Sequence, residues 1–427
     1  MPAGLQSTPL NICIVGGGFG GLYTALYLQK YRHLQNSRIT LIEPNNQFVF
    51  FPMMYELITD ELKQWELFPT YSRLLAGTTV QWQQAHAESI DLEQQTVSVS
   101  SGETFTYDYL VMATGAKSRP MNIPGLDEHA QTFRSFHDAL ILNERLASLV
   151  RAQAVQPSTD GMEPISVTAV GGGASGVELA CKVADYLGDR GIVTLVEHGS
   201  RLLSSMPKGI RRQANRALAK RQVNVRLETS VSSIGADTVT LKAGDATATI
   251  SSQLTLWAVG TQPQPWLGTQ PVKQNDYGQR ATRRTLQLVD YDNVFVLGDS
   301  ADVRGPKGNL APNTAQAAFQ AASKVAANLA AMTKGKSPKP FNYLHLGDMI
   351  TLGVGDAGLH SFGITLGGQL AAVIRRGVYV FRMPTLRHQF KVGRRALADL
   401  FRALLPPWGN RSHAATFSQS SFHRNSP

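Results

Sequence analysis

Asn11-Ile-Cys-Ile-Val-Gly-Gly-Gly-Phe-Gly-Gly21 decides the fold, because it joins an apolar strand pattern to a glycine-rich turn that opens a helix. Ile165-Ser-Val-Thr-Ala-Val-Gly-Gly-Gly-Ala-Ser-Gly176 repeats the arrangement. The first glycine permits a tight turn, the second lets a pyrophosphate approach the backbone, and the third lets the helix pack on the strand. Two such turns predict two bound dinucleotides. The spaced glycines are Gly16, Gly18 and Gly21, then Gly171, Gly173 and Gly176.

An acidic residue follows each turn at the end of the next strand pattern. Glu43 ends residues 38–43, and Glu197 ends residues 192–197. Each carboxylate is placed to accept hydrogen bonds from a ribose 2′-hydroxyl and to repel a 2′-phosphate. Glu197 therefore favours NADH in the second site, but Arg201 is near enough in sequence to receive the phosphate of NADPH. The sequence therefore does not decide between NADH and NADPH as the electron donor.

The composition and the cysteine content narrow the class of protein to which the chain can belong. The chain has 427 residues and a net charge of +10, and no run of about 18 apolar residues predicts a transmembrane helix. Residues 1–10 lack the basic start and apolar core of a signal peptide. Cys13 and Cys181 form neither a CxxC pair nor a metal cluster, so no metal is expected. This excludes the disulfide reductases, which need a reactive cysteine pair beside the flavin, and it argues against the sulfide:quinone reductases, which use cysteines to carry sulfur.

The positive charge is concentrated in residues 370–405, which contain eight basic residues and one acid. A helix over residues 386–404 would place apolar and basic side chains on opposite sides, which is typical of a helix in a membrane interface. Each basic residue near an anionic surface would contribute about 1 kcal/mol. An ordinary surface helix and a homodimer contact are the alternatives, and nucleic acid is not an expected partner because no recognition motif is present. The apolar side holds Leu386, Phe390, Leu397, Leu400, Phe401 and Leu404, and the basic side Arg387, Lys391, Arg395 and Arg402.

Three further motifs accompany the turns. They are the strand-and-turn pattern of residues 107–115 with its echo at 254–261, the buried-strand pattern of 293–299, and residues 170–180. Together with the turns, they resemble the two-dinucleotide flavoproteins, and within these the type II NAD(P)H:quinone oxidoreductases. The resemblance implies FAD at the first turn, beside Thr114, Gly115, Gly298 and Asp299, and NADH or NADPH at the second, with Gly260. A helix cap is the plain alternative for Asp299.

The resemblance also assigns residues to the reaction. It places Glu178 near the flavin and the quinone pocket, as the candidate catalytic carboxylate, although a capping box with Ser175 would equally explain a glutamate there. It associates Ala315, Gln316 and Gln320 with the quinone headgroup. Residues 47–66 and 379–391 are similar to the cyanobacterial and plastid enzymes of this family that reduce demethylphylloquinone.

The expected fold class is α/β, with two Rossmann-like dinucleotide-binding domains, the nicotinamide domain inserted in the flavin domain, and a C-terminal amphipathic membrane-associating region. The FAD-binding domain is expected in two parts, followed by the C-terminal region and a disordered tail. The expected boundaries are 1–134 and 264–334 for FAD, 135–263 for NAD(P)H, 335–405 for the membrane-associating region and 406–427 for the tail.

The predicted function is an FAD-dependent NAD(P)H dehydrogenase (quinone) of type II that does not pump protons. A hydride passes from NAD(P)H to FAD, and two electrons then reduce a membrane quinone, with demethylphylloquinone and plastoquinone as the candidates. The expected location is the cytoplasmic side of a membrane, cell or thylakoid, as a peripheral protein. A ferredoxin or rubredoxin-type reductase and a flavoprotein redox sensor with little turnover are the alternatives.

Overall fold

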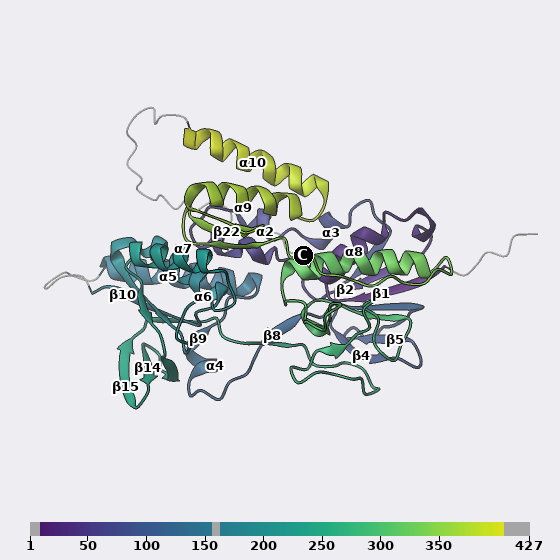
Figure 1. Cartoon of the computed structure of the whole chain (residues 1–427), viewed down its shortest axis with the longest axis horizontal. Helices are drawn as coiled ribbons and strands as arrows, with labels where there is room; N and C mark the ends of the chain where they lie inside the picture. The colour runs from purple at the N-terminus through teal and green to yellow at the C-terminus, as the bar shows by residue number, and fades with distance from the viewer. Residues whose placement is uncertain (1–8, 156–162, 405–427) are drawn as a thin grey trace, which may run out of the picture.

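The computed structural model describes residues 9–155 and 163–404. Two α/β bodies lie side by side, and a C-terminal region lies above them (Figure 1). Each body contains one of the glycine-rich turns. The tail expected to be disordered, residues 406–427, falls outside the described residues.

The first body is built on a parallel sheet of strand order β19-β7-β1-β2-β3, with the first turn following its central strand. Most of these strands are short apolar runs buried on both faces, as parallel sheets require. Helices α1 (Phe19–Leu28) and α8 (Ala315–Met332) pack against each other. The strands are β1 (Asn11–Val15), β2 (Arg38–Ile42), β3 (Val80–Gln83), β7 (Tyr109–Met112) and β19 (Val294–Val296), with a small antiparallel sheet of β4 (Ala87–Asp91), β5 (Thr96–Val99) and β6 (Thr104–Thr106) beside them.

The second body repeats this plan with the strand order β12-β11-β10-β16-β9. The second turn follows the central strand, and an antiparallel three-stranded sheet extends from the body (Figure 1). The elements are β9 (Ala130–Gln131), α5 (Phe136–Val155), β10 (Ile165–Val170), α6 (Ala174–Leu187), β11 (Gly191–Val196), α7 (Lys208–Lys220), β12 (Asn224–Arg226), β13 (Ser230–Ile234), β14 (Thr238–Ala243), β15 (Ala246–Ser251) and β16 (Leu254–Trp257).

Two antiparallel segments join the bodies. The chain leaves the first body through β8 (Ala116–Ser118) and returns through β17 (Thr261–Pro263), which pair with each other. The second body is therefore inserted in the first, which confirms the predicted fold class. Strand β9 already belongs to the second sheet, a few residues before the expected boundary at residue 135.

The C-terminal region consists of an antiparallel sheet and two helices. These are β21 (Asp348–Thr351), β22 (Ala357–Ser361), β23 (Ile364–Gly367), α9 (Gly368–Arg382) and α10 (Leu386–Leu404). Within residues 9–155 and 163–404, no helix is both long and apolar enough to cross a membrane. The shorter elements are the 3₁₀ turns η1 (Arg32–Leu34), η2 (Phe51–Leu57), η3 (Gly188–Arg190) and η4 (Gly298–Ser300), helices α2 (Gln64–Leu67), α3 (Tyr71–Leu74) and α4 (Leu126–His129), and strands β18 (Arg280–Ala281) and β20 (Ala301–Asp302).

Candidate functional site

The first glycine-rich turn is sterically restricted on one side and open on the other. Gly16 has φ +98°, and a Cβ there would lie 2.4 Å from the carbonyl oxygen of Ala113. A Cβ on Gly21 would lie 1.8 Å from the carbonyl oxygen of Gly16. Gly18 is the N-cap of α1, and a Cβ there would meet no described atom within 4 Å. The amino end of α1 is therefore free to receive a phosphate.

The second turn has the same construction. Gly171 has φ +110°, and a Cβ on Gly176 would lie 1.8 Å from the carbonyl oxygen of Gly171. Gly173 is the N-cap of α6 and also faces open space among the described residues. Two strand-turn-helix units that keep the same three glycines for the same reasons fit two dinucleotides.

The two predicted ribose-binding glutamates brace the turns. One oxygen of Glu43 accepts a hydrogen bond from the amide of Gly17 at 2.8 Å, and one oxygen of Glu197 accepts from the amide of Gly172 at 2.5 Å. Tyr71 donates its hydroxyl to the carbonyl of Gly17 at 2.8 Å. Asn45 also donates twice to the other oxygen of Glu43, and the amide of Gly199 donates to that of Glu197. A carboxylate has about four acceptor positions, so at least about one remains on each glutamate for a ribose hydroxyl. These amide contacts were not predicted from the sequence.

The remaining predicted FAD residues meet at the carboxyl edge of the first sheet. Thr114 and Gly115 follow β7, and Gly298 and Asp299 follow β19, so all four lie on the same edge as the first turn. The Thr114 hydroxyl is buried and has no hydrogen-bond partner within the described chain. Such a group fits a bound ligand with polar atoms.

Asp299 does not cap the following long helix. Helix α8 has Thr314 as its N-cap, and the Thr314 hydroxyl accepts the amide of Ala317 at 3.2 Å. Burial raises the pKa of Asp299, and the charge of Arg134 opposes this shift. A largely buried carboxylate at this edge fits a hydroxyl donor such as a ribityl chain, whereas the alternative of a plain helix cap is wrong for α8.

A cavity of about 1050 Å³ lies where the two bodies and the C-terminal region meet. Glu178 of α6 lines it together with Ala315 and Gln316 at the amino end of α8. Seven aromatic residues are also among its lining residues, namely Phe19, Phe50, Phe51, Tyr55, Phe319, Tyr343 and Tyr379. The structure therefore brings three of the predicted reaction residues to one cavity that both glycine-rich units border. Gly260, which follows β16, lines a small adjoining pocket that shares Phe51 and Ser175 with the cavity.

The two glutamines of α8 bind the backbone of residues 343–347. Gln316 accepts from the Tyr343 hydroxyl and from the amide of Leu346, each at 2.9 Å. Gln320 donates to the carbonyl of Leu344 at 2.8 Å and accepts from the amide of the same residue at 3.0 Å. Gln320 does not line the cavity. Its amide instead holds the segment that carries Tyr343 and His345 against α8.

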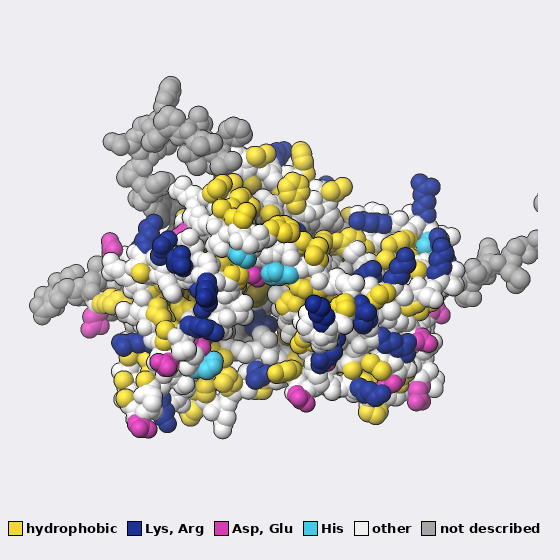
Figure 2. Space-filling view, in the orientation of Figure 1, with side chains coloured by type: hydrophobic (Ala, Val, Ile, Leu, Met, Phe, Trp, Pro, Cys, Tyr) yellow, Lys and Arg dark blue, Asp and Glu magenta, His cyan; other side chains and the backbone are white. Residues whose placement is uncertain are grey.

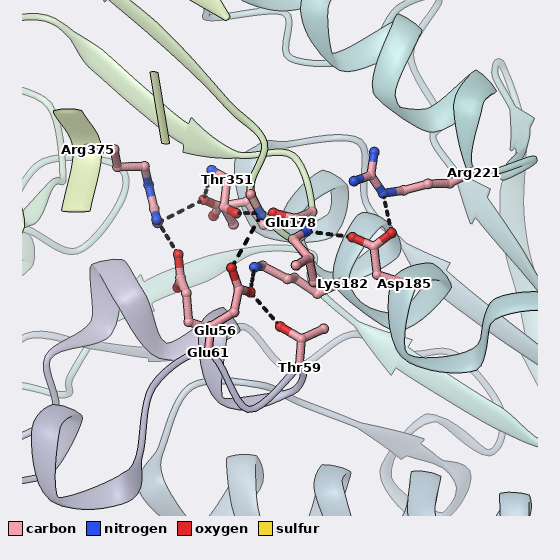
Figure 3. A network of polar contacts seen from close by, with 12 residues as sticks. Glu56, Thr59, Glu61, Glu178, Lys182, Asp185, Arg221, Thr351 and Arg375 are labelled. Atoms are coloured by element: carbon pink, nitrogen blue, oxygen red, sulfur yellow. Dashed lines mark hydrogen bonds and ion pairs between the residues drawn. The ribbon is translucent and has the colours of Figure 1, made fainter. Parts of the chain in front are cut away.

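Glu178 belongs to a buried ionic network (Figure 3). Its carboxylate accepts the amide of Thr351 at 2.9 Å and lies 3.8 Å from the Arg375 guanidinium. Arg375 also donates to Glu56 and to the carbonyl of Pro52. The N-cap of α6 is Gly173, and Glu178 reaches across to β21 rather than back to its own helix. The alternative of a capping box with Ser175 is therefore wrong.

Burial dominates the electrostatics of this network. It raises the pKa of Glu178 to about 8, against the opposing effects of Arg375 and of the hydrogen bond from Thr351. Burial also raises the pKa of Tyr55, whose hydroxyl lies near Ser175 and the Glu178 charge. A carboxyl group that changes protonation near neutral pH and faces a cavity can exchange a proton with a bound substrate.

Arg375, Glu56, Lys182 and Glu61 were missed as site residues by sequence reasoning. Arg375 was counted with the surface basic residues, yet its side chain is 4% exposed. Its burial could have been suspected from Ala371 and Tyr379, which lie one turn away on the same helix face. Lys182 is fully buried and pairs with Glu61, next to the Glu178 network. Nothing local in the sequence indicated that partner.

The C-terminal helix packs with its polar side toward the protein. Lys391 lies 4.2 Å from the centre of the Trp65 ring, and Arg395 is 2.8 Å from the fully buried carboxylate of Glu66. Arg395 is therefore turned toward the protein, whereas Lys391 and Arg387 remain exposed, so only part of the basic side follows the expectation for a membrane-binding helix. The apolar side faces solvent instead, with Leu386 82%, Phe390 73% and Leu397 58% exposed. The side chains of residues 399–404 fall outside the described ones.

Neither cysteine is placed for chemistry. Cys13 lies in β1 and Cys181 in α6, both buried and free. Burial raises the pKa of each thiol to about 12. Such thiols are not reactive nucleophiles. Among the described residues, no group of three His, Cys, Asp or Glu side chains is arranged to hold a metal ion.

Comparison with known proteins identifies the class. Residues 10–322 match the family described as "Pyridine nucleotide-disulphide oxidoreductase", and the chain belongs to that family. It is 39% identical to demethylphylloquinone reductase NdbB of Synechocystis sp., over 90% of this chain and 94% of that one. It is 35% identical to the alternative NAD(P)H-ubiquinone oxidoreductase C1, chloroplastic/mitochondrial, of Arabidopsis thaliana, over 90% and 79%.

Within that family, the chain is a type II NAD(P)H:quinone oxidoreductase, an FAD-dependent enzyme. The solved structure of NDH2 from Plasmodium falciparum in complex with NADH has the same fold, with a TM-score of 0.82 at 18% identity and coverage of 93% of this chain and 98% of that one. The family resemblance read from the sequence is confirmed.

Proposed function

We propose that the chain oxidises NADH or NADPH and reduces a membrane quinone, with demethylphylloquinone as the preferred substrate and plastoquinone as the next candidate. The observation that carries this proposal is that Glu178, Ala315 and Gln316 line the same cavity. The Synechocystis relative, named for demethylphylloquinone reduction, supports the substrate. FAD, when bound, supplies the two-electron chemistry that joins the two half-reactions.

The turns and strand ends would position the cofactors. We propose that the first turn, with Thr114, Gly115, Gly298 and Asp299, holds FAD through its phosphates and ribityl hydroxyls. The second turn, with Gly260, would hold the nicotinamide donor. Glu43 and Glu197 would each bind a ribose with the acceptor positions that the amides of Gly17 and Gly172 leave open. The proposed cofactor residues are Gly16, Gly18, Gly21, Glu43, Thr114, Gly115, Gly298 and Asp299 for FAD, and Gly171, Gly173, Gly176, Glu197 and Gly260 for NAD(P)H.

Glu178 would supply a proton at the quinone side of the cavity. Reduction of a quinone to a quinol consumes two electrons and two protons, and a hydride brings only one proton. With its pKa raised to about 8, Glu178 is protonated at neutral pH and can donate to a quinone oxygen. Ala315 and Gln316 would border the quinone ring, while Gln320 would act by holding residues 343–347.

The donor preference would depend on Glu197. Its side chain is 12% exposed and accepts the amides of Gly172 and Gly199, at 2.5 and 2.6 Å, which fixes the negative charge beside the ribose position. We propose NADH as the better donor, because a 2′-phosphate would meet that charge. Arg201 is exposed and could offset part of the repulsion for NADPH.

The C-terminal region would seat the enzyme on a membrane. Apolar side chains gather over α9 and α10, and basic side chains gather over α7 (Figure 2). The exposed apolar patch comprises Phe362, Ile364, Leu370, Val373, Phe381, Leu386, Phe390 and Leu397. Helix α7 packs on β22 and β23 beside this patch and contains no acidic residue. Its exposed cations, Lys208, Arg212, Arg216 and Lys220, would contact anionic headgroups.

We propose that α7 supplies membrane-binding charge in addition to the exposed Arg387 and Lys391 of α10. Peripheral binding on the cytoplasmic side, where NADH is available, would let a lipid-soluble quinone reach the enzyme. A homodimer that covers the same apolar patch is the alternative use of the surface. The expected division into FAD, NAD(P)H and membrane-associating regions is proposed with the boundaries given above, except that the NAD(P)H domain begins at β9.

The test is a two-stage reaction with purified enzyme. NADH or NADPH is first mixed with the enzyme, and flavin bleaching is followed by stopped flow. Demethylnaphthoquinone, plastoquinone or ubiquinone analogues are then added, and reoxidation is timed. We expect rapid bleaching and quinone-dependent recovery, fastest with the demethylnaphthoquinone. Bleaching without recovery for every quinone would refute the quinone reductase function.

A further inference from the structure

A second cavity, of about 710 Å³, lies between α9 and α10. It shares no lining residue with the first cavity. Helix α9 separates the two, because Tyr379 and Arg382 face the first while Ala372 and Val380 face the second. Tyr379 and Arg382 lie three residues apart, and Ala372 and Val380 lie two steps of four apart, so each pair lies on one side of the helix. The second cavity is therefore a separate site.

Small residues on both helices create the space. Ala372 and Gly377 of α9 line it opposite Gly393 and Ala396 of α10. Its rim includes Val373, Phe381 and Leu397, which also belong to the exposed apolar patch. A ligand would therefore enter through an apolar surface, and an apolar molecule could do so without losing favourable hydration.

The floor of the cavity is polar and contains an unsatisfied acceptor. Glu56 is 5% exposed, and one of its carboxylate oxygens pairs with Arg375. The other oxygen is buried without a hydrogen-bond partner in the described part of the chain. A buried acceptor left unpaired is costly, so a ligand that donates a hydrogen bond there would be favoured.

The charges around the floor of the cavity favour a ligand whose hydrogen-bond donor is electrically neutral. Glu56 pairs with Arg375, Glu61 with Lys182, and Asp356 with Arg221, so the three carboxylates that line the cavity already have cationic partners. A hydroxyl group satisfies the free oxygen of Glu56 without adding charge to a buried site. An ammonium group would have to lose its own hydration beside Arg375.

We propose that this second cavity binds a neutral amphiphile with a hydroxyl group on an apolar body, of the class of alkylated phenols and quinols, with the hydroxyl donated to Glu56. The molecule would come from the membrane phase through the apolar patch. Because Arg375 contacts both Glu56 and Glu178, occupancy would also be sensed in the first cavity. The effect on the first cavity rests on the proposed function, whereas binding of the amphiphile to the second cavity does not.

The test compares two ligands that differ only in whether they carry a hydrogen-bond donor. Binding of 4-pentylphenol and of its methyl ether, 4-pentylanisole, to the flavin-loaded enzyme is measured by isothermal titration calorimetry. We expect the phenol to bind at least about tenfold more tightly, as a hydrogen bond to a charged acceptor predicts. Equal affinities would overturn the proposal, and so would failure of both molecules to bind.

Matched variants locate the site. Ala396→Phe fills the cavity, whereas Ala398→Phe places the same side chain on an exposed position of the same helix. We expect Ala396→Phe to weaken phenol binding at least tenfold and Ala398→Phe to leave it unchanged. Ala372→Leu, from the opposite wall, replaces the first variant if its thermal unfolding shows a damaged fold. Unchanged binding in the filled variants would place the phenol elsewhere and refute the site.

Discussion

The guanidinium of Arg375, on α9, lies 3.8 Å from the carboxylate of Glu178, on α6 (Figure 3). The contact joins the C-terminal region to the helix that follows the second glycine-rich turn. Arg375 also pairs with Glu56 of η2, which belongs to the first body. One buried cation therefore ties together the three parts of the molecule that border the main cavity.

Removing this cation should destabilise the protein strongly. In Arg375→Ala, the carboxylate of Glu56 would stay buried without its cationic partner, so we expect a loss of about 3–5 kcal/mol in the free energy of unfolding. Chemical denaturation measures it. Arg394→Ala, at an exposed position on α10, is the control and should cost less than about 0.5 kcal/mol. Similar losses in the two variants would show that the buried cation is not needed.

Glu178 should make stability fall as pH rises. Its pKa in the folded protein is raised from the usual 4.5 to about 8, so folding favours the protonated form. The contribution of Glu178 is therefore complete below about pH 4.5 and is lost as pH rises through 8. Glu178→Gln, which stays neutral, should gain stability relative to the parent between these values. Parallel stability curves for the two proteins would contradict the raised pKa.

The same carboxyl group should shape the pH profile of turnover. If protonated Glu178 donates to the quinone, the rate of flavin reoxidation should fall above about pH 8 in the parent enzyme. Glu178→Gln should be slower at neutral pH and should lose this limb, while flavin reduction by NADH stays close to the parent rate. If the rate of flavin reoxidation in Glu178→Gln still fell above about pH 8, the fall would have to be assigned to another titrating group.

The sequence predicted those features that depend on neighbours along the chain. The turn at Gly16 and its copy at Gly171 were identified because strand, glycines and helix are contiguous, and the same local order predicted the inserted domain. The partnership of Glu56 with Arg375 was not predicted, because the two residues lie 319 positions apart along the chain. Periodicity likewise gave α10 two faces, but it could not tell which face meets the protein.

The glycines of the first turn should respond differently to the same substitution. Gly21→Ala places a Cβ 1.8 Å from the Gly16 carbonyl oxygen, so we expect a disrupted turn and loss of bound flavin. Gly18→Ala meets no described atom within 4 Å, so the fold should persist and only flavin affinity should fall. Flavin absorbance after gel filtration, with circular dichroism as the check of folding, separates the two. Full flavin content in Gly21→Ala would contradict the steric argument.

Membrane binding should depend on the apolar patch and on α7 for different reasons. Phe390→Ser and Leu397→Ser remove exposed apolar area, so binding to vesicles should weaken at every ionic strength. Arg212→Glu with Arg216→Glu reverses charge on α7, so binding should weaken only to vesicles with anionic lipid and only at low salt. Co-sedimentation with neutral and anionic vesicles measures both effects. If the serine variants bind as the parent does but change the oligomeric state on gel filtration, the patch is a dimer contact and the membrane proposal fails.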